Sequence, residues 1–282
     1  MAIPVVQSVS TTAFAGNVDN LVLSKPSGTV DGDLLIAFIS GSQPADSTPS
    51  GWTQELVDVS TRNWSIYSKI ASSEGASWTW GITDSNGEVG GGVIRIDGHK
   101  PSGYYDKEDQ DAVADDATPS YTNITITPAA AQSLLIFFVS WVADVGVTGV
   151  SGYAIATDNP TWTERIDLRG SGNNQGFAVA TALRPETSAT GVSSCTLDGA
   201  DGTADSDCAL ISILANPDVS VSPAVITMAA SVQAPTVTGG ATVSPAVVTI
   251  TAAVQAPTVS TAAAKWSNAS KNSTSWTNQN KS

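Results

Sequence analysis

The sequence is poor in the features that mark several common classes of protein. Its 282 residues include two cysteines and one histidine, too few for a disulfide scaffold or for a His-rich or mixed Cys/His zinc site. No apolar run approaches the ~18 residues of a membrane span, so we expect no membrane partner. Residues 1–7 lack a basic stretch followed by an apolar run, and the sequence therefore predicts no secretory signal peptide.

Charge is also scarce, and positive charge above all. Charged residues make up 13% of the chain, about half the usual quarter. Residues 1–216 hold 25 acids against nine Lys and Arg, a net charge of −16, whereas residues 217–282 hold one acid against three Lys, a net charge of +2. An acidic body repels phosphate backbones, so nucleic acid is not expected as a partner. The plainest interpretation of the acidity is solubility.

Strand-forming and turn-forming residues take the place of charge, and they occur in a diverged internal repeat. Residues 32–40 return as 132–140, 51–55 as 161–165, 64–69 as 177–182, and 93–97 as 209–213. The offset grows along the chain, as insertions in loops would cause. We infer two homologous domains, 1–99 and 100–216.

Each domain reads as short apolar runs separated by Gly, Pro, Asn and Asp. In the first domain the expected strands are 5–12, 20–24, 33–40, 53–59, 63–70, 76–82 and 89–97. This spacing predicts an all-β fold of two tandem jelly-roll-like β-sandwich domains. Residues 34–39 are apolar at every position, which predicts a central strand covered on both faces.

A second, tighter repeat follows the two domains. Residues 221–237 and 243–259 are identical at thirteen of seventeen positions, and each copy reads as two short strands bounded by Pro, such as 224–229 and 231–234. Such a unit is too small to bury a core, so residues 217–259 should pack on the neighbouring copy, on the body or on other subunits. In the tail, 260–282, Trp266 and Trp276 recur at a period of ten and are candidate assembly anchors.

Catalytic residues are not apparent. His99 lies at the proposed domain boundary, where a surface linker residue is the expected role. Cys195 and Cys208 flank a short loop in a predicted hairpin, and they form either a disulfide or two free buried thiols.

Acidic residues suggest one metal site, and Trp residues suggest one ligand site. Four acids in the loop after Cys195 are weak candidates for calcium, although their spacing does not match an EF-hand: Asp198, Asp201, Asp205 and Asp207. The alternative for these residues, and for the acidic stretch 106–116, is a solvated acidic loop. Trp78 and Trp80 share one strand face and could stack on a glycan. Trp52 and Trp162 match each other across the repeat, which favours a shared core position.

Residues 22–98 resemble a jelly-roll-like module that is common in tailed-bacteriophage virion proteins. The segments that carry the resemblance are 25–36 (KPSGTVDGDLLI), 49–52, 67–71 and 94–98. The repeats at 221–259 look like those of phage minor tail and fibre-like proteins, and residues 276–282 are similar to the ends of such proteins. The second domain departs from the pattern, since no Gly precedes Trp162 and the Tyr-Ser-Lys of 67–69 is missing.

The resemblance implies a non-enzymatic structural protein on the surface of a phage particle, with no cofactor and no catalytic residues to transfer. A tail or fibre-like component that mediates assembly or host-surface contact is the first expectation. A capsid decoration protein and a carbohydrate-binding adhesin are the alternatives. The expected partners are other virion proteins, further copies of the chain, with a trimer as the expected form, and a host-surface glycan.

Overall fold

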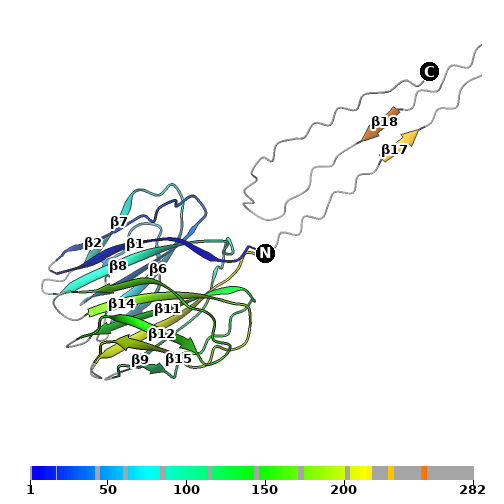
Figure 1. The fold of residues 1–282 in the computed structure, drawn as a ribbon. Helices are drawn as coiled ribbons and strands as arrows, with labels where there is room; N and C mark the ends of the chain where they lie inside the picture. The colour runs from blue at the N-terminus through cyan, green and yellow to red at the C-terminus, as the bar shows by residue number, and fades with distance from the viewer. Residues whose placement is uncertain are drawn as a thin grey trace, which may run out of the picture. The chain divides into compact units, whose positions relative to one another are not determined.

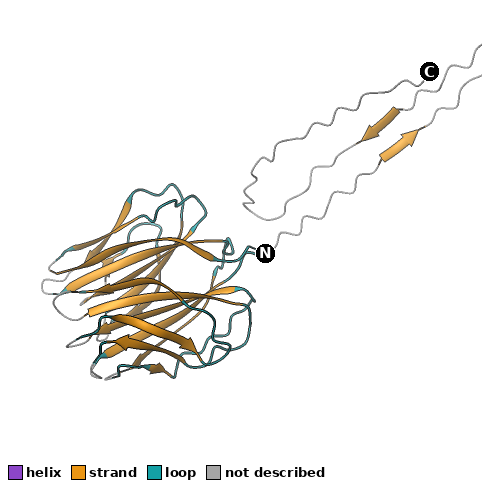
Figure 2. Cartoon of the chain, in the orientation of Figure 1, coloured by secondary structure: helices purple, strands orange, loops and turns teal. Residues whose placement is uncertain are grey.

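The computed structural model describes most of the first 217 residues and two short segments beyond them: 2–16, 18–41, 45–59, 63–82, 87–113, 116–142, 146–170, 175–200, 204–217, 228–231 and 249–252. Every regular element in these ranges is a β-strand, which confirms the predicted all-β class (Figure 2). Within the same ranges no helix is long and apolar enough to span a membrane. The chain divides into two compact units, residues 1–218 and 219–282.

The first half of the larger unit contains eight strands in two sheets. They are β1 (Val5–Gly16), β2 (Asn20–Ser24), β3 (Leu34–Gly41), β4 (Ala45–Ser47), β5 (Thr53–Asp58), β6 (Trp64–Ile70), β7 (Ser77–Ile82) and β8 (Glu88–Asp97). The sheet orders are β1-β8-β3-β6-β5 and β2-β7-β4. All seven predicted strands are present, and the prediction missed only the three-residue β4.

The second half repeats this plan strand for strand. Its strands are β9 (Tyr105–Val113), β10 (Ser120–Tyr121), β11 (Ser133–Val142), β12 (Gly149–Ile155), β13 (Thr163–Arg169), β14 (Gln175–Arg184), β15 (Ser193–Asp198) and β16 (Asp205–Ile213). The sheet orders, β9-β16-β11-β14-β13 and β10-β15-β12, are those of the first half with eight added to each number. The duplication inferred from the sequence therefore extends to the whole topology.

The strand pairings in each half are nested. In the first half β1 pairs with β8, β2 with β7 and β3 with β6, all antiparallel, as when one long hairpin is wrapped into two sheets. The departure is β5, which pairs with β6 in the larger sheet. The second half makes the same departure with β13 and β14.

The four sheets stack in four layers with three apolar cores. One core lies within each half, between its large and its small sheet. The third lies between the two large sheets and contains residues from both halves. Figure 1 shows the blue and cyan strands of the first half lying over the green and yellow strands of the second. The predicted boundary near residue 99 separates two sets of sheets, but the shared core joins them into one compact unit.

Equivalent residues meet in the shared core. The rings of Phe38 and Phe138 stack with centroids 5.7 Å apart, and the hydroxyl oxygens of Ser40 and Ser140 lie 2.8 Å apart. Contact between matched positions is the mark of a two-fold relation, so the halves pack like the subunits of a symmetric dimer. The prediction that residues 34–39 form a strand covered on both faces is confirmed, because alternate side chains enter the shared core and the core of the first half.

One part of the predicted alignment is wrong by a single residue. Phe38 lies opposite Gly92, and its equivalent Phe138 lies opposite Ala209, so Ile94 matches Ile211. The sequence comparison matched Val93 with Ala209. A shift of one residue in a strand moves every side chain to the other face. It went unnoticed because both faces of these strands are apolar.

The described part of the second unit is a pair of four-residue strands. β17 (Met228–Ser231) pairs antiparallel with β18 (Thr249–Ala252). Each strand comes from one copy of the 22-residue repeat, so the two copies pair with each other. β17 also runs through residue 230, where the sequence predicted a break between two strands.

Candidate functional site

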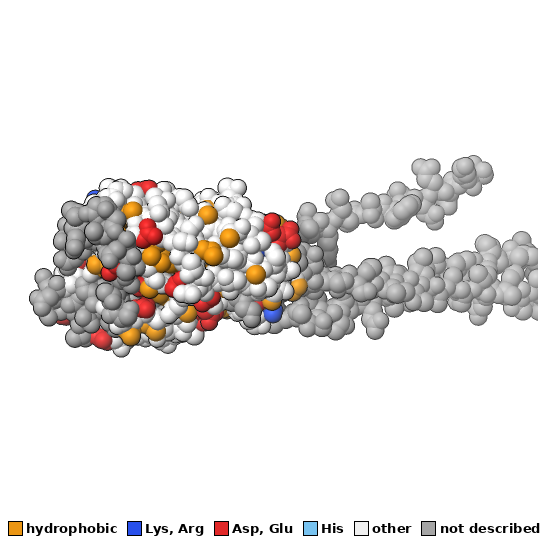
Figure 3. Space-filling model, turned by 90° about the horizontal axis from the view of Figure 1, so that it is seen from below, with side chains coloured by type: hydrophobic (Ala, Val, Ile, Leu, Met, Phe, Trp, Pro, Cys, Tyr) orange, Lys and Arg blue, Asp and Glu red, His pale blue; other side chains and the backbone are white. Residues whose placement is uncertain are grey.

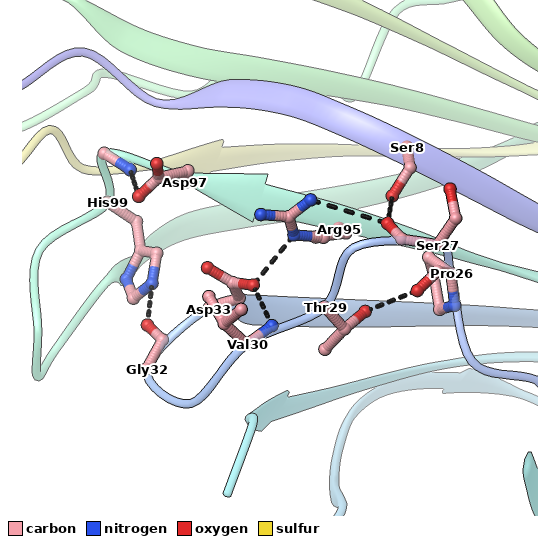
Figure 4. Close-up of polar contacts among 11 residues, drawn as sticks. Ser8, Pro26, Ser27, Thr29, Val30, Gly32, Asp33, Arg95, Asp97 and His99 are labelled. Carbon is pink, nitrogen blue, oxygen red and sulfur yellow. Dashed lines mark hydrogen bonds and ion pairs between the residues drawn. The ribbon is translucent and has the colours of Figure 1, made fainter. Parts of the chain in front are cut away.

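The loop of residues 25–33, between β2 and β3, is held by polar contacts (Figure 4). Arg95 Nε donates to Asp33 Oδ2 at 2.8 Å, and the same carboxylate oxygen accepts the backbone N–H of Val30 at 2.7 Å. Asp33 is only 3% exposed, so its charge depends on these partners. Gly28 and Gly32 have positive φ angles of 72° and 90°. The motif thus fixes the turn between β2 and β3.

His99 belongs to the same network, and its predicted role as a surface linker is wrong. The residue is 6% exposed, since β-bridge pairing with Ala215 draws the crossover between the halves into the body. Its Nδ1 lies 2.8 Å from the Lys100 carbonyl oxygen, and its Nε2 lies 3.0 Å from that of Gly32. Both partners are carbonyl acceptors, so a ring N–H donates to at least one of them. The ring joins the β2–β3 turn to the crossover.

A cleft of about 260 Å³ opens between the halves. Its lining comes from β5 and β6 of the first half and from β9 and β16 of the second: Asp58, Trp64, Gln110, Asp111, Ala112 and Asp207. Trp64 Nε1 donates to Asp207 Oδ2 at 3.2 Å across the shared core. The three carboxylates make the cleft a region that attracts cations. No sequence motif predicts this cleft, because its lining residues come from four strands.

The three predicted calcium ligands that lie among the described residues are divided between two sheets. Asp198 lies on β15 and accepts the Ser151 hydroxyl at 2.7 Å, whereas Asp205 and Asp207 lie on β16 in a different sheet. Asp201 lies outside the described residues. Among the described residues, no group of three or more His, Cys, Asp or Glu side chains is arranged to hold a metal ion. The structure therefore gives the calcium prediction no support.

Cys195 and Cys208 are free, buried thiols, so the disulfide alternative is not realised. The predicted hairpin is wrong, because β15 belongs to the small sheet and β16 to the large one, and the two do not pair. Both cysteines lie in the core of the second half. Burial raises the pKa of the Cys195 thiol to about 12 and raises that of Cys208 well above its ordinary value. Neither thiol is suited to chemistry.

Trp78 and Trp80 share a strand face as predicted, but that face is the core of the first half. Trp80 is fully buried and Trp78 is 7% exposed. Trp52 packs against both, with ring centroids 5.1 and 5.3 Å away. The Trp78 indole N–H donates to Glu74 at 2.9 Å. Neither ring offers a face to a sugar, so the glycan-stacking prediction is wrong for the described fold. Trp266 and Trp276 lie outside the described residues.

The acidic stretch 106–116 is largely an edge strand, where a solvated loop was the expectation. On β9, Asp106, Asp109 and Asp111 accept the backbone N–H groups of Ala129, Thr125 and Asn123. The equivalent edge of the first half uses hydroxyls: Ser8, Ser10 and Thr12 on β1 donate to the carbonyls of Ser27, Ser24 and Val22. Both halves thus close this side of the sandwich with hydrogen bonds between side chains and backbone. The side chains of the edge strand donate in the first half and accept in the second.

A second group of acids lies on β13 and β15. Burial and the charges of Asp167 and Asp198 raise the pKa of Glu164, and burial together with Asp198 raises that of Asp167 in spite of a hydrogen bond from Val150. Acidic side chains are also frequent elsewhere on the body: Figure 3 shows Asp and Glu scattered over one face with few Lys or Arg.

No family, no curated protein and no solved structure matches the chain.

Proposed function

We propose that the chain is a non-catalytic structural protein of a tailed-phage particle, a tail or fibre-like component at the particle surface that mediates assembly or host-surface contact. The observation that carries the proposal is the antiparallel pairing of β17 with β18, one strand from each copy of the repeat. An extension that contains paired strands and carries little charge, joined to an acidic body, suits attachment to other subunits. The resemblance of residues 22–98 and 221–259 to virion proteins agrees with this role.

A capsid decoration protein is the second candidate. The acidic four-layer body would stand on the shell, and the extension would clamp neighbouring subunits. The filled cores between all four sheets favour a rigid surface module in both cases. The third candidate, a carbohydrate-binding adhesin, has lost its main support, because Trp78 and Trp80 lie in a core.

Immunogold labelling of purified particles from the source organism tests the proposal, with an antibody raised against residues 1–216. Gold along the tail or at its tip is the expected result. Gold over the head would move the protein to capsid decoration. Unlabelled particles, with the protein detected elsewhere in the culture, would overturn both virion roles.

The oligomeric state provides a separate test of the role given to the extension. Full-length protein should form a homo-oligomer, with a trimer as the expected form, and the chain truncated after residue 216 should be monomeric in sedimentation velocity. If the truncated chain keeps the full-length state, the extension does not mediate assembly.

A further inference from the structure

The outer edge of β13, in the second half, is closed by two charged side chains. Asp167 accepts the backbone N–H of Val150, next to the start of the neighbouring small sheet. Arg169 Nη1 donates to the carbonyl oxygen of Val147 at 2.9 Å. β13 also contacts β12 and, across the two halves, β1. These side chains bridge the two sheets of the second half, so the edge is not open to another strand.

The duplication identifies the residues that hold the same positions in the first half. Leu56 lies opposite Ile66, and Ile166 lies opposite Val179. Ile66 and Val179 are themselves equivalent, because they face Phe38 and Phe138. Counting one position onward in each half matches Val57 with Asp167, and counting three matches Val59, the residue directly after the end of β5, with Arg169.

Both valines are exposed, and they cannot bridge the sheets as the charged pair does. The side chain of Val57 is 38% exposed and that of Val59 is 65% exposed. In the described part of the chain β5 pairs with β6 alone, which leaves its other edge facing outward. An outward strand edge that carries apolar side chains is a template for a further strand.

We propose that the outer edge of β5 binds, by strand addition, a strand from the C-terminal repeats (219–259) of a second copy of this chain. Residues 219–259 contain ten Val and seven Thr and carry no charge, so their composition suits pairing with a valine-bearing edge. A two-stranded sheet as short as β17 and β18 is marginal alone and gains stability from further pairing.

Charge favours the same occupant. The tail that follows the repeats, residues 260–282, contains three Lys and no acid, whereas residues 1–216 carry a net charge of −16. Asp58, at the end of β5, also lines the acidic cleft between the halves. The extension of another copy is thus attracted to this side of the body. The inference rests on the proposed structural role, because it names the surface through which the copies assemble.

Cross-linking of the full-length protein tests the occupant. A photoreactive phenylalanine replaces Val57, and equal amounts of unlabelled and ¹⁵N-labelled protein are mixed before irradiation. We expect cross-linked peptides that join residue 57 to 219–259, about half of them with one labelled and one unlabelled partner, as random mixing gives. Cross-links within one isotope only would place the strand of the same chain on β5. Cross-links to β5 of another copy, or to no repeat peptide, would also overturn the proposal.

A matched pair of variants tests the edge itself. The double substitution Val57→Asp, Val59→Arg gives β5 the bridging residues of β13, and we expect the dissociation constant of self-association to rise about tenfold or more. The control Val22→Asp changes a valine that is 45% exposed on β2 and should leave association unchanged. Unchanged association of the double variant, with a native circular dichroism spectrum, would overturn the proposal. If the double variant associates normally and the antibody still labels the particles, the proposal about the β5 edge fails but the proposed virion function stands.

Discussion

At matched positions, the first half of the body places Asp33 and Arg95 where the second half places Ser133 and Ser212. The first pair forms a buried ion pair, whereas Ser133 donates to the Ala130 carbonyl. Edge strand β1 uses hydroxyls where β9 uses carboxylates. The topology is nevertheless the same in all eight strands. The shared alternation of apolar residues thus sets the fold, and polar side chains are free to diverge into different local roles.

The largest expected effect concerns the two thiols, which report on the core of the second half alone. Burial raises the pKa of Cys195 from 9.0 to about 12, so about a thousandfold less thiolate is present at neutral pH. Labelling of the native protein with a thiol reagent should therefore be slower than labelling of the unfolded protein by at least this factor. After denaturation without reductant, both cysteines should react. If neither reacts, they form a disulfide.

Removal of either stacked ring breaks the contact between the halves. Phe38→Ala and Phe138→Ala should each lower the free energy of unfolding by about 3–5 kcal/mol, because both rings are fully buried in the shared core. In urea titrations, tryptophan fluorescence and circular dichroism should give one coincident transition for each variant. Two separate transitions would show that the halves fold independently.

The ion pair between Asp33 and Arg95 distinguishes the first half from the second, which has serines at these positions. Asp33→Ala leaves Arg95 without its carboxylate and should cost about 2–4 kcal/mol. The matched substitution in the second half, Ser133→Ala, removes one neutral hydrogen bond and should cost about 1 kcal/mol. Urea denaturation of both variants measures the difference. Equal losses would show that the ion pair adds nothing beyond a neutral hydrogen bond.

The smallest effect comes from Glu164, whose counterpart in the first half is Gln54. Burial and two neighbouring carboxylates raise the pKa of Glu164 above its ordinary value of 4.5. The ionised form is therefore disfavoured in the fold, and the penalty is present above the raised pKa and absent below pH 4.5. Because the group is largely solvated, Glu164→Gln should stabilise the protein by only about 0.5 kcal/mol at neutral pH. Thermal melts should show this gain shrinking as the pH falls. A gain that persists below pH 4.5 would contradict the cause given.

Much of the fold could be predicted, because apolar alternation and turn residues are local signals. The strands of the first half, the duplication and the doubly covered run at 34–39 follow from them. The shared core could not be predicted, since an all-apolar strand does not say what covers each face. The predicted hairpin between Cys195 and Cys208 is wrong for a related reason, because its two strands are adjacent in the sequence but belong to different sheets.

The candidate site was less predictable than the fold. Burial of Trp78, Trp80 and His99 depends on packing between elements that are distant in sequence. The acids of β9 looked like a solvated loop because their partners are backbone N–H groups, which carry no sequence signal. Val57 and Val59 became informative only when the register matched them with Asp167 and Arg169.

Hydrogen–deuterium exchange of full-length protein, measured below and above the concentration at which it associates, tests most directly the claim that the halves differ in their edges. Assembly should slow exchange in peptides that cover β5 and leave peptides that cover β13 unchanged, since only the first edge gains backbone hydrogen bonds. Equal protection of both edges, or protection of neither, would contradict the account.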